Sequence, residues 1–426
     1  MRPIQAVLCL GALALASGCS SIAKGVTEAV LEQSASEDKR QCHIDGPAWD
    51  GLETALKKQE ADRAMNQSYR QLKVVMVHGI GRHLPGYSAR LTEKLMHELN
   101  LDVRSENAKE IILSDPDIGD GPTALLRVWR YTNKAATREL LFYELTWSPI
   151  AEEAKKPIDY DDSVEQSYRR TVINNLAKGF FNARVPDALI YLGATRRPIL
   201  ASVRQATCWA TSADWNELPD SGKHECNLLD PKRLKYLKDD DYAFLSHSIG
   251  SRVVIDTLQQ QAEFAVSQTT QTAAQFREIS GNKQYPVFML ANQLPLLQLG
   301  QPIPKVHGQI ADYCRPGGQF YANRLMGGLN IKAFSDPNDL LSYGIPPKFA
   351  DDYLDSRMCP TITNITLNVS NPVSLAGIDV VNPGEAHSGY DYDDRVIAII
   401  ARGVGGPDEA QLIKDKCTWM HTVPSR

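Results

Sequence analysis

Apolar runs that are typical of strands alternate along this chain with segments that carry apolar residues at helical spacing. The run "LKVVMV" ends abruptly in His-Gly, which predicts a fully buried strand that breaks into a loop. Further runs of this kind are "ALLRVWRY", "LLFYELTW", "YAFLSHS" and "YPVFMLAN". Leu91, Leu95 and Leu99 recur at helical spacing, and "GSRVVIDTLQQQAEFA" reads as an amphipathic helix. This alternation predicts an α/β fold whose mainly parallel sheet is covered by helices on both faces.

The pattern changes along the chain and suggests five parts. Residues 1–18 read as a signal peptide, and residues 19–70 are polar and helix-compatible, so we expect a tether followed by an N-terminal helical segment. The sheet core is expected in two pieces, 71–149 and 236–426, which are separated by a largely helical stretch at 150–235.

The signal peptide assignment rests on the first residues, "MRPIQAVLCLGALALASGCSS". Arg2 precedes an apolar run that is too short to cross a bilayer comfortably, and small residues follow it. The end of the segment resembles a bacterial lipoprotein signal, with Ala16 where such signals usually carry Leu. The resemblance implies cleavage before Cys19, lipidation of Cys19, and an envelope location, with Ser20 favouring the outer membrane facing the periplasm. An ordinary secretory peptide is the alternative.

Six cysteines remain after Cys9 and Cys19 are set aside, and an even number in an exported chain predicts disulfides. The sequence does not choose among the possible connectivities. We favour Cys208 with Cys226, which would close one polar loop, and this choice leaves Cys314 with Cys359 and Cys42 with Cys417.

Composition narrows the classes of function. The chain is 43% hydrophobic and 23% charged, with a net charge of -5 and no dense basic block, so nucleic acid is not an expected partner. Neither a CxxC pair nor a Cys/His spacing suited to a metal occurs, and we expect no metal and no cofactor.

One short stretch, "FLSHSIGSR", carries the candidate chemistry. A nucleophilic serine on a sharp strand-to-helix turn needs small residues two positions before and after it, because its backbone passes close to neighbouring strands. Ser248 satisfies this requirement with Ser246 and Gly250, although Ser246 stands where the motif has glycine. Phe244 stands at the corresponding place before Ser246, so Ser248 is the better nucleophile. The alternative is that Ser248 is an ordinary loop serine.

A serine nucleophile also needs a histidine base and a carboxylate that orients it. Asp339 in "SDPNDLLS" is the preferred acid, and Asp336, which precedes a proline, is kept as the alternative because it could equally form a turn. Only His387 and His421 follow Asp339, and His421 lies near the C-terminus. His387, in the loop "NPGEAHSGY", is therefore the expected base.

With these residues in place, the chain resembles the α/β-hydrolase superfamily, specifically its lipase and serine-esterase-like members. The resemblance rests on "HGIG", "SHSIG", "SDPND" and "AHSGY". The stretch "DALIYLG" also looks like the Asp-x-x-x-Tyr helix start seen before the nucleophile strand in some serine esterases. It implies the α/β-hydrolase fold, in which His78, Gly79 and Gly81 form an oxyanion loop. The backbone N–H groups of Ile80 and Ile249 would then bind the oxyanion. His78 is expected to shape this loop by hydrogen bonding.

The expected activity is hydrolysis of carboxylic esters through an acyl-enzyme, with lipid esters as the candidate substrates. An acyltransferase with the same triad and a non-catalytic envelope protein are the alternatives. The distance from Gly79 to Ser248 is 169 residues (248 − 79), whereas two strand–helix crossovers need about 60. Most of the surplus falls in 150–235, so we expect a helical cap over the site.

Overall fold

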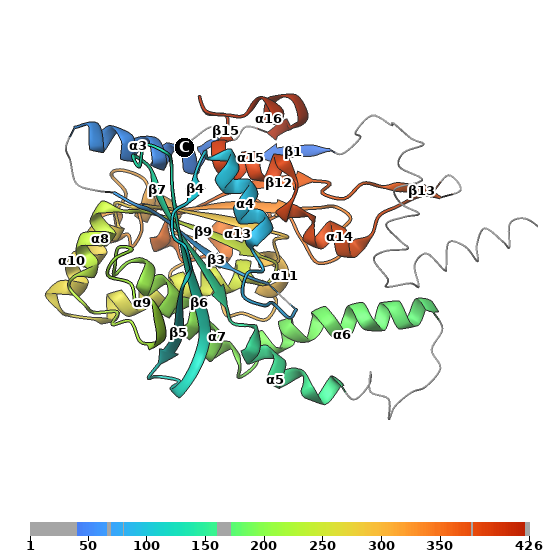
Figure 1. The fold of residues 1–426 in the computed structure, drawn as a ribbon, viewed down its shortest axis with the longest axis horizontal. Helices are drawn as coiled ribbons and strands as arrows, with labels where there is room; N and C mark the ends of the chain where they lie inside the picture. Colours follow the sequence, from blue (N-terminus) through green and yellow to red (C-terminus); the bar gives the residue numbers. More distant parts are fainter. Residues whose placement is uncertain (1–40, 66–69, 80, 160–171, 376–377, 422–426) are drawn as a thin grey trace, which may run out of the picture.

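The computed structural model describes residues 41–65, 70–79, 81–159, 172–375 and 378–421 (Figure 1). Its main feature is a 12-stranded mixed sheet, in which eleven strands run in the order β16-β1-β12-β11-β10-β9-β3-β7-β6-β5-β8 and β4 pairs with β6. The strands of this sheet are β1 (Cys42–Asp45), β3 (Leu72–Val77), β4 (Asp102–Val103), β5 (Lys109–Asp115), β6 (Gly119–Thr132), β7 (Glu139–Thr146), β8 (Ser221–His224), β9 (Asp241–His247), β10 (Gln284–Leu290), β11 (Gly328–Ser335), β12 (Pro360–Leu367) and β16 (Thr418–His421).

The centre of the sheet is parallel and its margins are mixed. Strands β7, β3, β9, β10, β11 and β12 pair in parallel, whereas β5, β6 and β7 form antiparallel pairs. Two small pairs lie outside this sheet, β2 (Trp49–Asp50) with β15 (Gly403–Val404) and β13 (Val373–Leu375) with β14 (Ile378–Val380). The expected α/β class with a mainly parallel, helix-flanked sheet is thereby confirmed.

Helices cover both faces of the sheet (Figure 1). The helices of six or more residues are α3 (Leu52–Ala64), α4 (Ala89–Glu98), α5 (Ser148–Asp159), α6 (Val172–Leu192), α7 (Arg196–Ala210), α8 (Arg233–Asp239), α9 (Gly250–Ser267), α10 (Gln271–Ser280), α14 (Pro383–Ser388), α15 (Asp394–Arg402) and α16 (Gln411–Lys416). Shorter ones are α11 (Leu294–Gln298), α12 (Ile310–Cys314), α13 (Phe349–Tyr353), η3 (Tyr321–Asn323), η4 (Ser356–Met358) and η5 (Gly389–Asp391).

Two apolar clusters form the core, one on each face of the sheet. On β3, Val75 and Val77 face the cluster that includes α7 and α9, whereas Val74 and Met76 face the cluster that includes α3, α4 and α15. Successive residues of a strand point to opposite faces, and every residue of β3 is buried. This double burial explains why the central strands are continuous apolar runs rather than alternating ones.

The N-terminal part of the described chain contains a strand that we did not expect. We predicted a helical segment after the tether, and α3 is such a helix, but β1 precedes it and joins the main sheet between β12 and β16. Strand β1 has four residues, of which Cys42 and Ile44 are buried. A strand this short gives almost no periodic signal, and its partners are more than 300 residues away in the sequence.

The stretch 150–235 is largely helical as expected, but only part of it lies away from the sheet. Helix α7 is buried along most of its length and packs against β3, β5, β6, β7 and α9, and β8 extends the sheet beside β5. Helices α5 and α6 contact each other and extend beyond the sheet (Figure 1). Among the described helices of this stretch, α5 and α6 are therefore the ones that could form the predicted cap.

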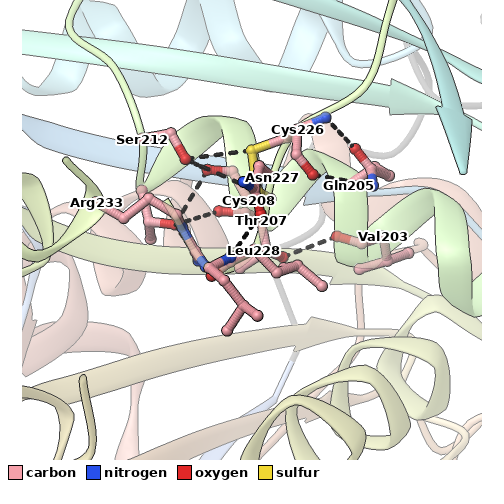
Figure 2. Close-up of a disulfide and its surroundings, with 11 residues drawn as sticks. Val203, Gln205, Thr207, Cys208, Ser212, Cys226, Asn227, Leu228 and Arg233 are labelled. Atoms are coloured by element: carbon pink, nitrogen blue, oxygen red, sulfur yellow. Dashed lines mark hydrogen bonds between the residues drawn. A yellow bond between two sulfur atoms is a disulfide. The ribbon is translucent and has the colours of Figure 1, made fainter. Parts of the chain in front are cut away.

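Three disulfides pair Cys42 with Cys417, Cys208 with Cys226, and Cys314 with Cys359. This is the connectivity favoured from the sequence, and it is confirmed. Figure 2 shows the second bond at the C-terminal end of α7, where Gln205 donates to the carbonyl of Cys226 and accepts from its N–H. The disulfide and Gln205 together fix the polar loop against α7.

Among the described residues, no helix is long and apolar enough to cross a membrane. The predicted signal peptide and Cys19 lie outside the described residues.

Candidate active site

The candidate site lies where two neighbouring parallel strands, β3 and β9, end. Helix α4 follows β3 and packs in one core cluster, whereas α9 follows β9 and packs in the other. The chain therefore leaves these two strands toward opposite faces of the sheet. In open α/β sheets, the crevice at the carboxyl ends of such strands is the usual place for a ligand.

Ser248 occupies a sharp turn between β9 and α9. Its φ angle is 58°, in the left-handed region that a residue with a side chain seldom adopts. Its backbone N–H donates to the carbonyl of Leu290, at 2.8 Å, and Ser251 donates both its N–H and its hydroxyl to the carbonyl of Ser248. A strained residue held from several sides is typical of functional positions.

The small residues around Ser248 are required by close contacts. A Cβ atom on Gly250 would lie 2.5 Å from the carbonyl oxygen of Val77, which leaves no room for a side chain. Ser246 takes the place of the motif's first glycine, and it is fully buried. Its hydroxyl donates to the carbonyl of Phe288 on β10, at 3.3 Å, so the extra polar group has a partner.

Ser248, His387 and Asp339 come together although they are far apart in the sequence. The hydroxyl of Ser248 is 3.1 Å from Nε2 of His387, and Nδ1 of His387 is 2.8 Å from a carboxylate oxygen of Asp339. Ser248 and His387 are fully buried, and Asp339 is 5% exposed. This is the geometry in which a neutral histidine accepts the serine proton while the carboxylate fixes its tautomer.

Among the described residues, the hydrogen bond from His387 to a carboxylate goes to Asp339 and not to Asp336. The two carboxylate oxygens of Asp336 accept hydrogen bonds from the backbone N–H of Asn338 and from that of Val369. Asp339 lies one turn further along, and its other oxygen accepts from the N–H of Leu341. Asp336 therefore shapes the loop after β11, and Asp339 is the carboxylate that faces the histidine.

His78 orders the start of the loop after β3. Its Nε2 accepts from the backbone N–H groups of Trp147 and Ser148, so Nδ1 carries the proton and donates to the carbonyl of Gly79. The ring stacks between His83 and Trp147, with centroid distances of 4.4 and 4.5 Å. Burial lowers the pKa of His78 well below its usual range. His78 thus stays neutral and shapes the loop by hydrogen bonding, as the sequence suggested.

Of the two predicted oxyanion donors, Ile249 belongs to the described residues and Ile80 does not. Ile249 is fully buried and immediately precedes α9, where a helix leaves N–H groups without intrahelical partners and has a partial positive charge. The N–H of Gly81 has a different use, because it donates to the carboxylate of Asp187 at 2.6 Å.

His247 supports the histidine of the triad rather than replacing it. The Nε2 of His247 donates to the backbone carbonyl of His387 at 2.8 Å, and the two rings meet edge to face. His247 therefore helps to place α14, which carries His387.

Sequence reasoning missed the contacts that α6 makes with the site. Asp187 and Tyr191 belong to "DALIYLG", which resembles a helix start, yet both residues lie well inside α6. Tyr191 donates to Asp256 on α9 at 2.5 Å, and Arg196 and Arg252 pair with the same carboxylate. Burial raises the pKa of Tyr191 well above its usual range, so its hydroxyl stays protonated as a donor.

Within the part of the chain that the structure describes, no group of three or more His, Cys, Asp or Glu side chains is arranged to hold a metal ion. Comparison of the chain with protein-family models, with curated proteins and with solved structures finds no match.

Proposed function

We propose that this protein is a serine hydrolase of the α/β-hydrolase fold that cleaves carboxylic esters through an acyl-enzyme. The observation that carries the proposal is the hydrogen-bonded series from Ser248 through His387 to Asp339. The strained turn at Ser248 and its position at the end of a central parallel strand support it. The order along the chain, oxyanion loop, serine, acid and histidine, is also that of the family.

In the proposed reaction, Oγ of Ser248 attacks the ester carbonyl while Nε2 of His387 takes its proton. His387 then gives this proton to the departing alcohol, which leaves an acyl group on Ser248. Water attacks the acyl-enzyme with His387 again as the base, and the acid and free enzyme result. The N–H of Ile249 and the N-terminal end of α9 stabilise the negative charge that develops on the carbonyl oxygen.

A fluorophosphonate probe, which forms a covalent bond with activated serines, tests the proposal. We expect the wild type to be labelled and to hydrolyse nitrophenyl esters, and Ser248→Ala to do neither. Ser246→Ala is the matched control, because it removes a buried hydroxyl two residues away. Among the described residues, this hydroxyl donates a hydrogen bond to the carbonyl of Phe288 and to no member of the triad. Equal labelling of wild type and Ser248→Ala would exclude Ser248 as the nucleophile.

An acyltransferase with the same triad differs only in the acceptor of the acyl group. Product analysis in the presence of an added alcohol distinguishes the two activities, because a transferase forms a new ester and a hydrolase forms the free acid. Lipid anchoring at Cys19 remains a prediction from the sequence. The three disulfides are consistent with the oxidising compartment that such an anchor implies.

A further inference from the structure

The carboxylate of Asp187 links a helix outside the sheet to the loop that follows β3. One oxygen accepts the backbone N–H of Gly81 at 2.6 Å, and the other pairs with the ammonium group of Lys155 on α5 at 2.6 Å. The side chain of Asp187 is 1% exposed, and that of Lys155 is 11% exposed. A buried carboxylate with two such partners is costly to disturb.

From this arrangement we infer that Asp187 is the positioning residue of the oxyanion loop. The inference rests on the proposed function and extends it to a residue that touches no reacting atom. Gly79 passes directly over Ser248, since a Cβ on Gly79 would lie 3.1 Å from the Ser248 hydroxyl oxygen. Gly81 follows two residues later, and its hydrogen bond to Asp187 fixes the loop on the C-terminal side of Gly79.

The loop needs such a support because its own sequence does not make it rigid. Gly81 has a φ of 98°, and no atom lies within 4 Å of the position that a Cβ would take there. A glycine in open space loses much conformational freedom when it is ordered. His78 fixes the loop where it leaves β3, and the hydroxyl of Ser148 donates to the carbonyl of His83 further along. The hydrogen bond from Gly81 to Asp187 supplies the point of attachment between them.

Helix α6 is itself attached to the element that follows the nucleophile. Tyr191 lies one helical turn after Asp187 and donates to Asp256 on α9. One face of α6 therefore contacts both sides of the candidate oxyanion site, the loop after β3 through Asp187 and the serine helix through Tyr191. This double attachment keeps Gly81 at a constant position relative to Ser248.

Lys155 has a separate electrostatic role in this arrangement. An unpaired carboxylate close to the site would oppose the negative charge of a tetrahedral intermediate. The ion pair with Lys155 offsets the charge of Asp187 while leaving its oxygen available to Gly81. The side chain of Asp187 thus has two separable properties: it accepts a hydrogen bond from Gly81, and it carries a charge.

Paired variants at Asp187 and Lys155 test this separation. D187N/K155M keeps an acceptor for Gly81 and removes both charges, whereas D187L/K155M removes the acceptor at similar volume. We expect D187N/K155M to keep kcat for a nitrophenyl ester within ~3-fold of wild type. D187L/K155M should lose ~10- to 100-fold in kcat with a smaller change in KM, below the ~10²- to 10³-fold of losing an oxyanion donor itself.

Hydrogen exchange of peptides that cover residues 78–88 provides a readout apart from activity. Exchange should rise in D187L/K155M and stay near the wild-type rate in D187N/K155M. Asp115→Asn is the matched control, because Asp115 is also buried, accepts a backbone N–H from Asp117 and pairs with Arg204, but lies on β5. It should change neither exchange in this loop nor kcat.

If the wild type is active but the two double variants have equal kcat and equal loop exchange, the inference about Asp187 is overturned and the proposed function is not. A wild type that neither reacts with the probe nor hydrolyses esters overturns the proposed function instead, while the exchange data still decide whether Asp187 orders the loop. If D187L/K155M does not fold, D187S/K155M takes its place, because the shorter serine side chain does not reach Gly81.

Discussion

Gly79 and Ser248 are so close that a single methyl group cannot be placed between them. A Cβ atom on Gly79 would lie 2.4 Å from the Cβ of Ser248, a distance that real atoms do not adopt. The loop after β3 and the turn after β9 are thus in direct contact, although 168 residues separate them in the sequence (248 − 79 − 1). This contact defines the candidate site.

Gly79→Ala is expected to abolish most of the activity. The added methyl group must displace either the loop or Ser248, and a displacement of about 1 Å in a catalytic arrangement can cost ~10²-fold in rate. Ester hydrolysis and probe labelling measure the loss. Gly121→Ala serves as the control, because a Cβ there meets no atom within 4 Å. If Gly79→Ala were as active as Gly121→Ala, the close contact would have no part in the chemistry.

Asp339→Asn should reduce kcat by about 10³- to 10⁴-fold, because an amide no longer holds His387 in the tautomer that accepts the serine proton. Asp336→Asn should keep most of the activity and instead lower the free energy of unfolding by about 1–3 kcal/mol, since its oxygens satisfy loop N–H groups. Steady-state kinetics and denaturant unfolding of both variants check this. The reverse pattern would make Asp336 the acid of the triad.

Lys332 on β11 should make the stability of the protein depend on pH above neutrality. Its side chain is 1% exposed, lies over the ring of Trp49 and has no carboxylate partner within ion-pair distance among the described residues. Burial lowers the pKa of Lys332 to about 7, from an ordinary value of 10.5. Between these values the unfolded chain binds more protons than the folded one, so the Lys332 contribution to stability rises with pH across this window.

Lys332→Met is therefore expected to raise the thermal midpoint at about pH 7, and this advantage should shrink toward about pH 10. Thermal unfolding at several pH values measures the difference, with Lys348→Met as a variant of an exposed lysine. A stability difference that does not change with pH would show that Lys332 is not buried as a titrating group.

The Cys42–Cys417 disulfide should contribute more to stability than the Cys208–Cys226 disulfide. The first closes a separation of 375 residues and the second one of 18, and the chain-entropy model gives more stabilisation for longer loops, within a range of about 2–5 kcal/mol. Double alanine variants of each pair, compared by denaturant unfolding, test the order. A smaller effect of the first pair would mean that β1 and β16 separate from the sheet before the rest unfolds.

Much of the architecture follows from local sequence pattern. The apolar run of β3 predicts a strand that is buried on both faces, and the helical spacing of α4 and α9 predicts their packing against the sheet. The order of Ser248, Asp339 and His387 along the chain also points to a triad, as in the family that the sequence resembles. These features are local, or depend on order along the chain, so one sequence is enough to read them.

Other features depend on contacts between distant segments. Strand β1 forms because β12 and β16 lie beside it, and a four-residue strand has no pattern of its own. The choice between Asp339 and Asp336 as the candidate acid is likewise decided by which carboxylate reaches His387.

The sequence by itself determined the alternation of strands and helices, the six cysteines available for disulfides, the candidate nucleophile and base, and two candidate acids. The tertiary structure decided which of two aspartates faces the histidine, why Ser246 can replace a glycine, and that Asp187 holds Gly81. Hydrophobic periodicity is a property of neighbouring residues, and it can therefore be read from the sequence alone. Hydrogen bonds such as that from Gly81 to Asp187 join residues 106 positions apart, and only the folded chain brings them within reach.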